Sequence, residues 1–505
     1  MAAGTLTRTF RTKGFQPRLL SSIMGHLRVG SRAGFHSSAP VDKNVVVAMD
    51  GTWNSPVDET NVVRLARHLM GHGFSQRPSY DEQVVSYIEG IGVTGDDTFD
   101  GGAVGAGIGR QIREGYRGIA NGVARNMFTP IAYDTSHPQP WRHFHYVPDT
   151  AYVPGDKIFL FGFSRGAFEA RALAAMILTV GILRPENADD YNITRGYKLY
   201  KKISHSKNLG TYTPEAYAAE LKEFQDLCYP KETTNIHFVG VWDTVVTLGI
   251  PPHIKIGPAV SRAMKLLGND HFDPRRGDMH AITDIPEGVN HFYHALASNE
   301  TRLPFLPTLG SPSAKHRDPA DKDHTHQQLW FDGDHSDIGG GHSWKDVIAS
   351  GYMRFIPFIW MLKMAMERGL YVDPAFLDAH RELITVSRGR PNSTANAIKA
   401  WKLLGIAPRP DVSTTFTVPH ERDNPEHTDP TVKVHSSVAY RIAATGHIAP
   451  PLLPFLKAHG IDPDMPFDPA DHPDVFAAED GVNSNFYGDS NKTGYYPGGY
   501  APATT

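Results

Sequence analysis

The sequence KIFLFGFSRGAFEAR, residues 157–171, predicts the fold of this chain. Its apolar run at 158–161 is typical of a buried strand, and it leads into Gly-x-Ser-x-Gly and then into helix-forming residues. Between a strand and a helix this pentapeptide indicates a nucleophile elbow, because the glycines let the two elements pack closely while the serine stands clear of the sheet. Ser164 is therefore the candidate nucleophile. The alternative is a glycine-rich turn with an incidental serine.

Strand and helix patterns alternate on both sides of this elbow. The expected strands are 44–49, 83–89, 235–242 and 327–331, and the expected helices are 61–70, 110–120, 167–178, 191–229 and 344–368. Such alternation predicts an α/β fold. We expect an α/β-hydrolase-like, mostly parallel sheet flanked by helices, with insertions such as 123–150 and a less regular C-terminal extension.

Three segments are expected along the chain: 1–40, 43–372 and 373–505. The second is the predicted catalytic domain, and the third is an extension that ends in a disordered Gly/Pro tail at 495–505. The first segment carries six Lys or Arg and no acidic residue, so its net charge is +6. Because the whole chain has a net charge of −4, the remaining residues carry −10. An Arg- and Ser-rich, acid-poor, amphipathic start predicts a cleaved mitochondrial presequence and delivery to the matrix. The alternative is a disordered basic arm.

Composition excludes several classes of function. The net charge of −4 offers no basic face for nucleic acid, and the single cysteine excludes a disulfide framework and a cysteine-based zinc site. The most apolar stretch, 352–366, is short and interrupted by Pro357 and charged residues, so no transmembrane segment is expected. The glycine-rich stretch 101–109 lacks the Gly-Lys-Ser/Thr ending of a phosphate loop. We expect it to be a flexible active-site loop before the helix at 110–120, with a nucleotide site as the alternative.

A serine nucleophile needs a base to accept its proton and an acid to orient that base. In α/β hydrolases these partners follow the serine in the order Asp or Glu, then His, each after a strand. Asp243 follows the strand 235–242, and His335 lies in a glycine-flanked loop after the strand 327–331. These two residues are the candidate acid and base, although an Asp at a strand end can also be a turn or helix cap.

Other readings of these histidines and carboxylates stay open. His291 and His294 also follow Ser164 and Asp243, and they are the runner-up bases. The loop 332–342 carries three Asp and two His, and oxygen-rich loops with glycine bind hard cations. Our main expectation is a site with no metal and no cofactor.

The oxyanion of an acyl-transfer reaction needs backbone N–H donors close to the nucleophile. One is expected from Arg165, directly after the serine, and the second from Gly51 or Thr52, in the turn after the first strand. Asp50 is expected to tie that turn together through side-chain hydrogen bonds to backbone N–H groups.

Four motifs together resemble one known family: DGTWN at 50–54, PGDKIFLFGFSRGA at 154–167, GVWDTV at 240–245 and GDHSDIGGG at 333–341. The chain resembles the DUF2235 family of α/β hydrolases, whose best-known members are phospholipase effectors of the bacterial type VI secretion system. The resemblance spans about residues 43–370. By position it implies Ser164 as nucleophile, Asp243 as acid and His335 as base.

Some features depart from this family. The segment HALASNETR at 294–302 is similar to the family's His-Ala-Leu-Ala-x-Asp-Glu-Arg-Arg, but it has Asn299 in place of the acid and Thr301 in place of an arginine. The insertion 123–150 and the presequence also depart. We therefore expect a mitochondrial serine esterase that acts on a small-molecule or lipid ester, with phospholipid acyl esters as the leading substrate. The alternatives are a non-catalytic binding protein with this fold and a metal-assisted hydrolase that uses the loop 332–342.

The sequence predicts no nucleic-acid partner and leaves the oligomeric state undetermined. Two segments could contact a membrane surface, namely the insertion 123–150 and the basic, amphipathic stretch 254–267. For the latter, an ordinary surface helix is the favoured reading.

Overall fold

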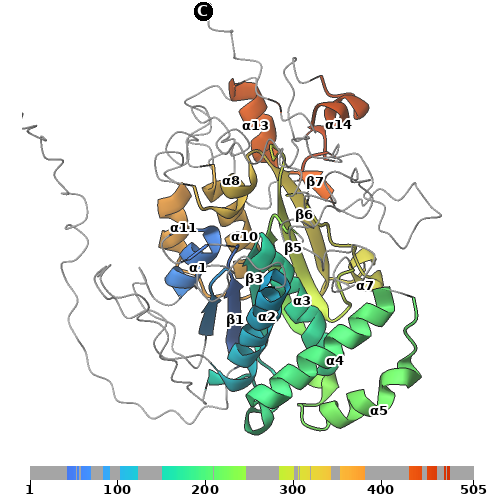
Figure 1. Cartoon of the computed structure of the whole chain (residues 1–505). Helices are drawn as coiled ribbons and strands as arrows, with labels where there is room; N and C mark the ends of the chain where they lie inside the picture. The colour runs from blue at the N-terminus through green and yellow to red at the C-terminus, as the bar shows by residue number, and fades with distance from the viewer. Residues whose placement is uncertain are drawn as a thin grey trace, which may run out of the picture. The chain divides into compact units, whose positions relative to one another are not determined.

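Seven parallel strands form one sheet in the computed structural model of the protein (Figure 1). In spatial order they are β2 (Gln83–Ile88), β1 (Asn44–Met49), β3 (Lys157–Phe163), β4 (Ile236–Trp242), β5 (Val289–Ala297), β6 (Thr325–Phe331) and β7 (Val432–Val434). The structure describes residues 42–52, 54–55, 58–69, 83–90, 103–122, 150–208, 210–245, 284–300, 305, 307–318, 320–342, 353–381, 432–445, 448, 452–462, 471–473 and 475–477. The predicted α/β class with a parallel sheet is confirmed.

The central strands are buried along almost their whole length. Every residue of β1 is buried, and β3 is buried from Ile158 to Phe163. Parallel strands covered on both faces need apolar side chains at successive positions, which explains the uninterrupted apolar runs in the sequence. The register places Leu160 of β3 between Val47 of β1 and Val239 of β4.

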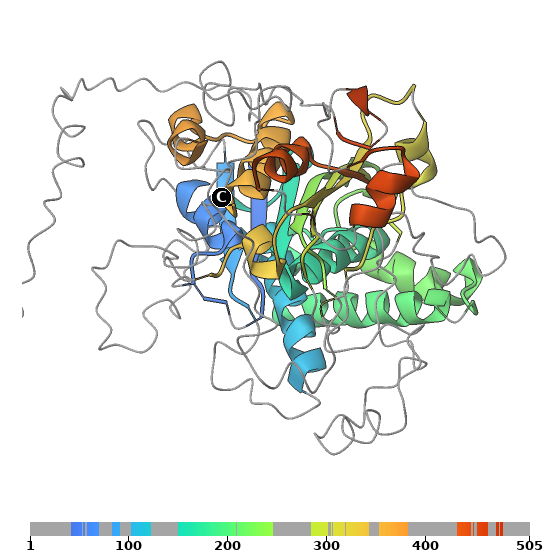
Figure 2. The ribbon, with the colours of Figure 1, turned by 90° about the horizontal axis from the view of Figure 1, so that it is seen from above.

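Helices cover both faces of the sheet (Figures 1 and 2). One hydrophobic core joins β1, β3 and β4 to α2 (Ala103–Asn121), α3 (Arg165–Val180), α4 (Asp190–Asn208) and α5 (Pro214–Gln225). A second core, on the other face, joins the strands to α1 (Asn61–Leu69), α10 (Phe355–Glu367) and α11 (Pro374–Arg381). The elbow helix α3 thus lies on one face, and the apolar helix α10 lies on the other.

The strand order changes direction at β1, which is flanked by β2 on one side and β3 on the other. The chain therefore leaves the carboxyl ends of β1 and β3 in opposite directions. Ligand sites in open α/β sheets form at such a switch point. The turn after β1 holds Gly51 and Thr52, and the turn after β3 holds Ser164, so the topology places these residues at the same crevice.

The C-terminal extension contributes to the sheet. β7 pairs with β6, and Val434 lies in a third hydrophobic core with Leu296 and Trp330. α13 (Ser436–Thr445) and α14 (Leu452–Ala458) complete this core. The predicted division at residue 372 therefore does not mark the edge of the sheet.

Two expectations about local structure were wrong. The glycine-rich stretch 101–109 was expected to be a flexible loop, but α2 already begins at Ala103. Two glycines of α2 allow close helix packing, because a Cβ at Gly109 would lie 2.7 Å from the Tyr197 hydroxyl oxygen and one at Gly115 would lie 2.8 Å from Leu173 Cδ2. β5 was not expected at all, because its sequence VNHFYHALA mixes one asparagine and two histidines with apolar residues.

Several predictions concern residues outside those that the structure describes. These are the presequence 1–40, the insertion at 123–149, the amphipathic stretch 254–267 and the tail 495–505. Among the helices that the structure describes, none is both long enough and apolar enough to cross a bilayer.

Candidate active site

Ser164 lies in a sharp, strained turn between β3 and α3. Its φ of 57° and ψ of −121° are sparsely populated by residues with a side chain, at a cost of about 1–3 kcal/mol. A Cβ at Gly162 would lie 2.4 Å from the Gly166 carbonyl oxygen, and one at Gly166 would lie 2.2 Å from the Met49 carbonyl oxygen. Both glycines are therefore required for the strand, the turn and β1 to approach one another.

His335 joins Ser164 to Asp243. Its Nε2 lies 2.8 Å from Ser164 Oγ, and its Nδ1 lies 2.6 Å from Asp243 Oδ2. A carboxylate can only accept, so Nδ1 carries the proton and Nε2 presents its lone pair to the serine hydroxyl. All three side chains are buried, with 8% or less of their surface exposed. The structure thus brings together the three residues that the sequence selected, with His335 in hydrogen-bond contact with both of the others.

The Asp243 carboxylate is fixed from the neighbouring strand. Its Oδ1 accepts from Ala297 N–H at 2.9 Å, and the Asp243 N–H donates to the Ala295 carbonyl at 2.7 Å. Asp243 has a φ of 43°, so it also occupies a strained turn. β5 therefore holds the carboxylate whose second oxygen faces His335.

His335 is held by the short helix α8 (His335–Gly339), of which it is the first residue. Asp334 caps this helix and accepts from the N–H groups of Ser336 and Asp337, each at 3.0 Å. The imidazole lies between two aromatic rings, with centroid distances of 4.6 Å to Phe163 and 4.9 Å to Phe305. Capping and packing thus fix the position and the plane of the ring.

Asp334, Asp337 and His342 bring three potential metal ligands within 4.8 Å of one another. Their polar atoms already interact: His342 Nε2 lies 2.8 Å from Asp334 Oδ1, and the Asp334 N–H donates to Asp337 at 3.1 Å. Asp334 and Asp337 thus form the cap of α8, and His342 binds to that cap.

The turn after β1 lies directly against the nucleophile. A Cβ at Gly51 would be 3.2 Å from Ser164 Cβ, so the turn packs tightly against this serine. Asp50 accepts from Gly51 N–H, Thr60 Oγ1 and Tyr87 OH, all at 2.8 Å, which confirms its expected role. Burial raises the pKa of Asp50, and the three hydrogen bonds lower it. Burial is the larger effect, so the pKa is raised to about 7.

Of the three predicted oxyanion donors, Gly51 is the least suited. Its N–H is engaged by the Asp50 carboxylate, within its own turn. Arg165 is the first residue of α3, and the N–H groups of a helix's first turn have no partner inside the helix and point out of its amino end. Thr52, next to Gly51, remains the candidate second donor.

The comparison with protein families bears on this site. Residues 43–126 and 144–364 match the family model described as the catalytic domain of the type VI secretion system (T6SS) phospholipase effector Tle1-like proteins. The matched residues make up more than half of the chain. The chain belongs to this family. The predicted resemblance is confirmed, and the match includes Ser164, Asp243 and His335.

Similar individual proteins share only part of their length with this Tle1-like chain. An uncharacterized protein of Saccharomyces cerevisiae, YEL023C, is 29% identical over 217 residues, which are 43% of this chain and 28% of that protein. The structure of the Tle1 effector bound to the VgrG spike has a TM-score of 0.30 and 18% identity, over 63% of this chain and 56% of that one. The crystal structure of an uncharacterized protein from Pseudomonas aeruginosa has a TM-score of 0.35 and 14% identity, over 66% of this chain and 47% of that one.

His294, a runner-up base, has a different role in the Tle1-like domain. Its Nε2 accepts from Thr244 N–H at 3.0 Å, and its Nδ1 lies 3.1 Å from Gln328 Oε1. Both ring nitrogens are thus engaged, and the ring is fully buried. His291, the other runner-up, is the third residue of β5 and contacts Thr325, at the opposite end of the strand from the candidate site. The structure thus places His335, and neither of these two histidines, in hydrogen-bond contact with Ser164 Oγ.

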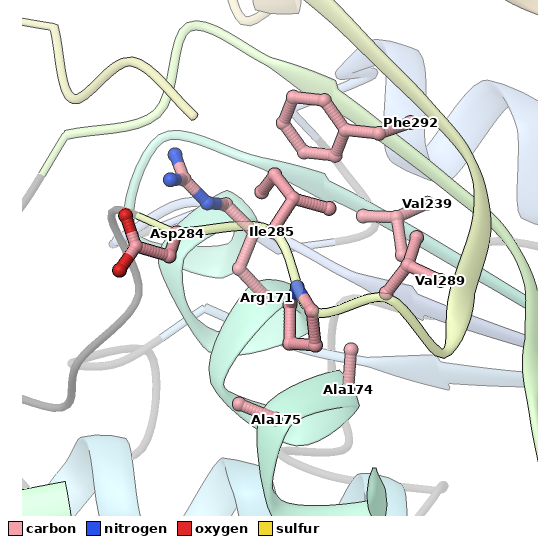
Figure 3. Close-up of a pocket in the computed structure, with 9 residues that line it drawn as sticks. Arg171, Ala174, Ala175, Val239, Asp284, Ile285, Val289 and Phe292 are labelled. Carbon is pink, nitrogen blue, oxygen red and sulfur yellow. The ribbon is translucent and has the colours of Figure 1, made fainter. Parts of the chain in front are cut away.

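Arg171 of α3 lines a small cavity together with Asp284 and Phe292 (Figure 3). Its guanidinium donates to the carbonyls of Thr308 and Leu309 at 2.6 and 2.9 Å, and the Thr308 N–H donates to the Thr244 carbonyl at 2.8 Å. The cavity beside Arg171 has room for about one water molecule, roughly 10 Å³, so it is no substrate pocket. Burial lowers the pKa of Arg171 to about 9, and Asp284 opposes that shift.

Sequence reasoning missed the supports of the site. Ala297 acts through a backbone N–H, which any residue except proline could provide, so no side-chain pattern marks it. Gln328, Phe305 and Arg171 lie outside the four motifs, and their contacts are made with segments that are distant in sequence. Only the HALA segment at 294–297, through its likeness to a family motif, could have drawn attention to β5.

Proposed function

We propose that this chain is a serine hydrolase that cleaves carboxylic esters, with phospholipid acyl esters as the leading substrate class. The observation that carries the proposal is the position of His335, within 2.8 Å of a serine hydroxyl and 2.6 Å of a buried carboxylate. The family description, a phospholipase effector catalytic domain, supports the lipid substrate.

The reaction would be acyl transfer in two steps. Ser164 Oγ attacks the ester carbonyl carbon while His335 Nε2 accepts the hydroxyl proton, and the His335 imidazolium then gives this proton to the departing alcohol. Water attacks the acyl-enzyme by the same path and releases the acid. Asp243 keeps His335 oriented and stabilises the imidazolium. The N–H groups of Arg165 and Thr52 are the proposed donors to the tetrahedral oxyanion.

The direct test is labelling of the full chain with a fluorophosphonate, which reacts with activated serines. We expect labelling of the unmutated protein and its loss in Ser164→Ala and His335→Ala. Phospholipid vesicles should then yield free fatty acid, and chelation should leave this activity unchanged. A folded protein that is not labelled would support a non-catalytic binding protein, and activity lost on chelation would support the loop 332–342 as a metal site.

We also propose that residues 1–40 deliver the protein to the mitochondrial matrix. The support is the charge pattern, with six basic and no acidic residues in this segment. A fluorescent protein fused to residues 1–40 should enter mitochondria, and the same fusion with its six basic residues changed to Gln should not. A cytosolic location of the first fusion would exclude the proposal.

A further inference from the structure

The Thr52 hydroxyl is buried and forms no hydrogen bond with any residue that the structure describes. A buried hydroxyl without a partner is destabilising, and native proteins leave few polar groups in this state. Such a group calls for an explanation, and a ligand that supplies the missing partner is one.

The position of Thr52 points to the ligand. Its neighbour Gly51 abuts the nucleophile, where an added Cβ would lie 3.2 Å from Ser164 Cβ and 3.1 Å from the Phe163 ring. The turn is closed by hydrogen bonds from Asn54 N–H to the Gly51 carbonyl at 2.9 Å and from Gly90 N–H to the Asn54 carbonyl at 3.0 Å. Thr52 is thus carried by a hydrogen-bonded turn whose Gly51 packs against Ser164.

One backbone N–H of this turn, that of Gly51, already donates a hydrogen bond within the protein. The Gly51 N–H donates to Asp50 Oδ1, and Asp50 is itself held by Thr60 and Tyr87. Among the described residues of this turn, Asn54 N–H also donates to the Gly51 carbonyl, so the N–H of Thr52 is the backbone donor that is left for the oxyanion. A hydroxyl on the same residue offers a second donor at no cost in backbone geometry.

We propose that the Thr52 hydroxyl is a catalytic residue that donates a hydrogen bond to the ester carbonyl oxygen as that oxygen becomes an oxyanion. This rests on the proposed function. When Ser164 Oγ bonds to the carbonyl carbon, the electron pair of the C=O double bond moves to the oxygen, and the serine proton moves to His335 Nε2. Thr52 keeps its own proton throughout, so the step needs no further reactant. A donor aimed at the developing charge stabilises the transition state more than the neutral ester.

The test compares Thr52→Val with Thr52→Ser, using p-nitrophenyl butyrate as the substrate. Valine keeps the shape of threonine without the hydroxyl, and we expect kcat to fall about 100-fold with KM changed by less than about twofold. Serine restores the hydroxyl, and kcat should stay within about fivefold of the unmutated protein. Because none of the described residues bonds to the hydroxyl, Thr52→Val should also leave the melting temperature unchanged or raise it.

The combination of lower activity with unchanged or higher stability separates a catalytic hydroxyl from a structural one. A Thr52→Val variant that keeps its kcat would overturn the proposal, and so would one that loses kcat and melting temperature together. Failure of the proposed function is recognised separately, because the unmutated protein would then show no Ser164-dependent labelling by the fluorophosphonate.

Discussion

Two neighbouring strands each bring a buried histidine toward Asp243, and the two histidines differ in their partners. His335, after β6, contacts a carboxylate through Nδ1 and the Ser164 hydroxyl through Nε2. His294, within β5, contacts a glutamine oxygen through Nδ1 and the Thr244 N–H through Nε2. Both rings have the same protonated nitrogen, but only one presents its lone pair to a group that can lose a proton.

The comparison separates a candidate base, His335, from a residue that supports the backbone, His294. A backbone N–H keeps its proton, so the Nε2 of His294 can only hold Thr244 and, through it, the turn that begins at Asp243. His335 faces a hydroxyl whose proton it can accept, and the carboxylate beside it stabilises the resulting charge. The two histidines thus differ in the groups that the strands and their turns bring to the ring nitrogens, and we expect their roles to follow from these hydrogen-bond partners.

The largest expected effect is the difference in kcat between the two variants in which one histidine is replaced by glutamine. The amide of glutamine reaches the position of the histidine Nε2. His335→Gln should lower kcat for an ester at least about 10⁴-fold, because an amide cannot accept and return a proton near pH 7. His294→Gln should keep kcat within about tenfold, because the glutamine oxygen can still accept from Thr244 N–H. Steady-state kinetics with p-nitrophenyl butyrate measure both. Equal losses in the two variants would remove the distinction between the histidines.

A smaller effect, on stability, is expected for His294→Ala. The change leaves the buried Thr244 N–H without its acceptor and opens a cavity, which together should lower the free energy of unfolding by about 2–4 kcal/mol. It should also lower kcat by about tenfold, as the turn at Asp243 loosens. Urea denaturation and kinetics test this. The control is His291→Ala, at the other end of β5, which should lower stability without affecting kcat.

The smallest effect extends the comparison to a third buried polar group, Asp50 at the end of β1. Its pKa is raised by burial from 3.8 to about 7, so folding favours the protonated form. That contribution is fully present below pH 3.8 and is lost as the pH rises through 7, so stability should fall by about 2 kcal/mol between pH 5 and pH 8.

The control for this pH effect is Asp50→Asn. Its amide can accept from Gly51 N–H and donate to the hydroxyls of Thr60 and Tyr87. The variant should therefore fold and lack the Asp50 part of the pH dependence, as measured by urea denaturation at the two pH values. The same slope of stability with pH in both proteins would show that Asp50 does not titrate in this range.

Much of the site could be predicted from sequence because its residues lie at strand ends with local signatures. Ser164 is marked by its glycines, each of which prevents a backbone collision. Asp243 and His335 follow apolar runs, and parallel strands bring their carboxyl ends to one edge of the sheet. The α/β class and the order of the three residues were determined in this way.

Only the tertiary structure shows that His335 and not His294 contacts Ser164 Oγ, that the Gly51 N–H is engaged by Asp50, and that residues 103–109 form a helix. Each of these depends on which groups from distant segments meet, such as Gln328 with His294, Asp50 with Gly51 N–H, and Tyr197 with Gly109. A sequence pattern records the local propensity of a segment. The roles of buried polar atoms follow from hydrogen-bond geometry that exists only after the strands and helices have packed.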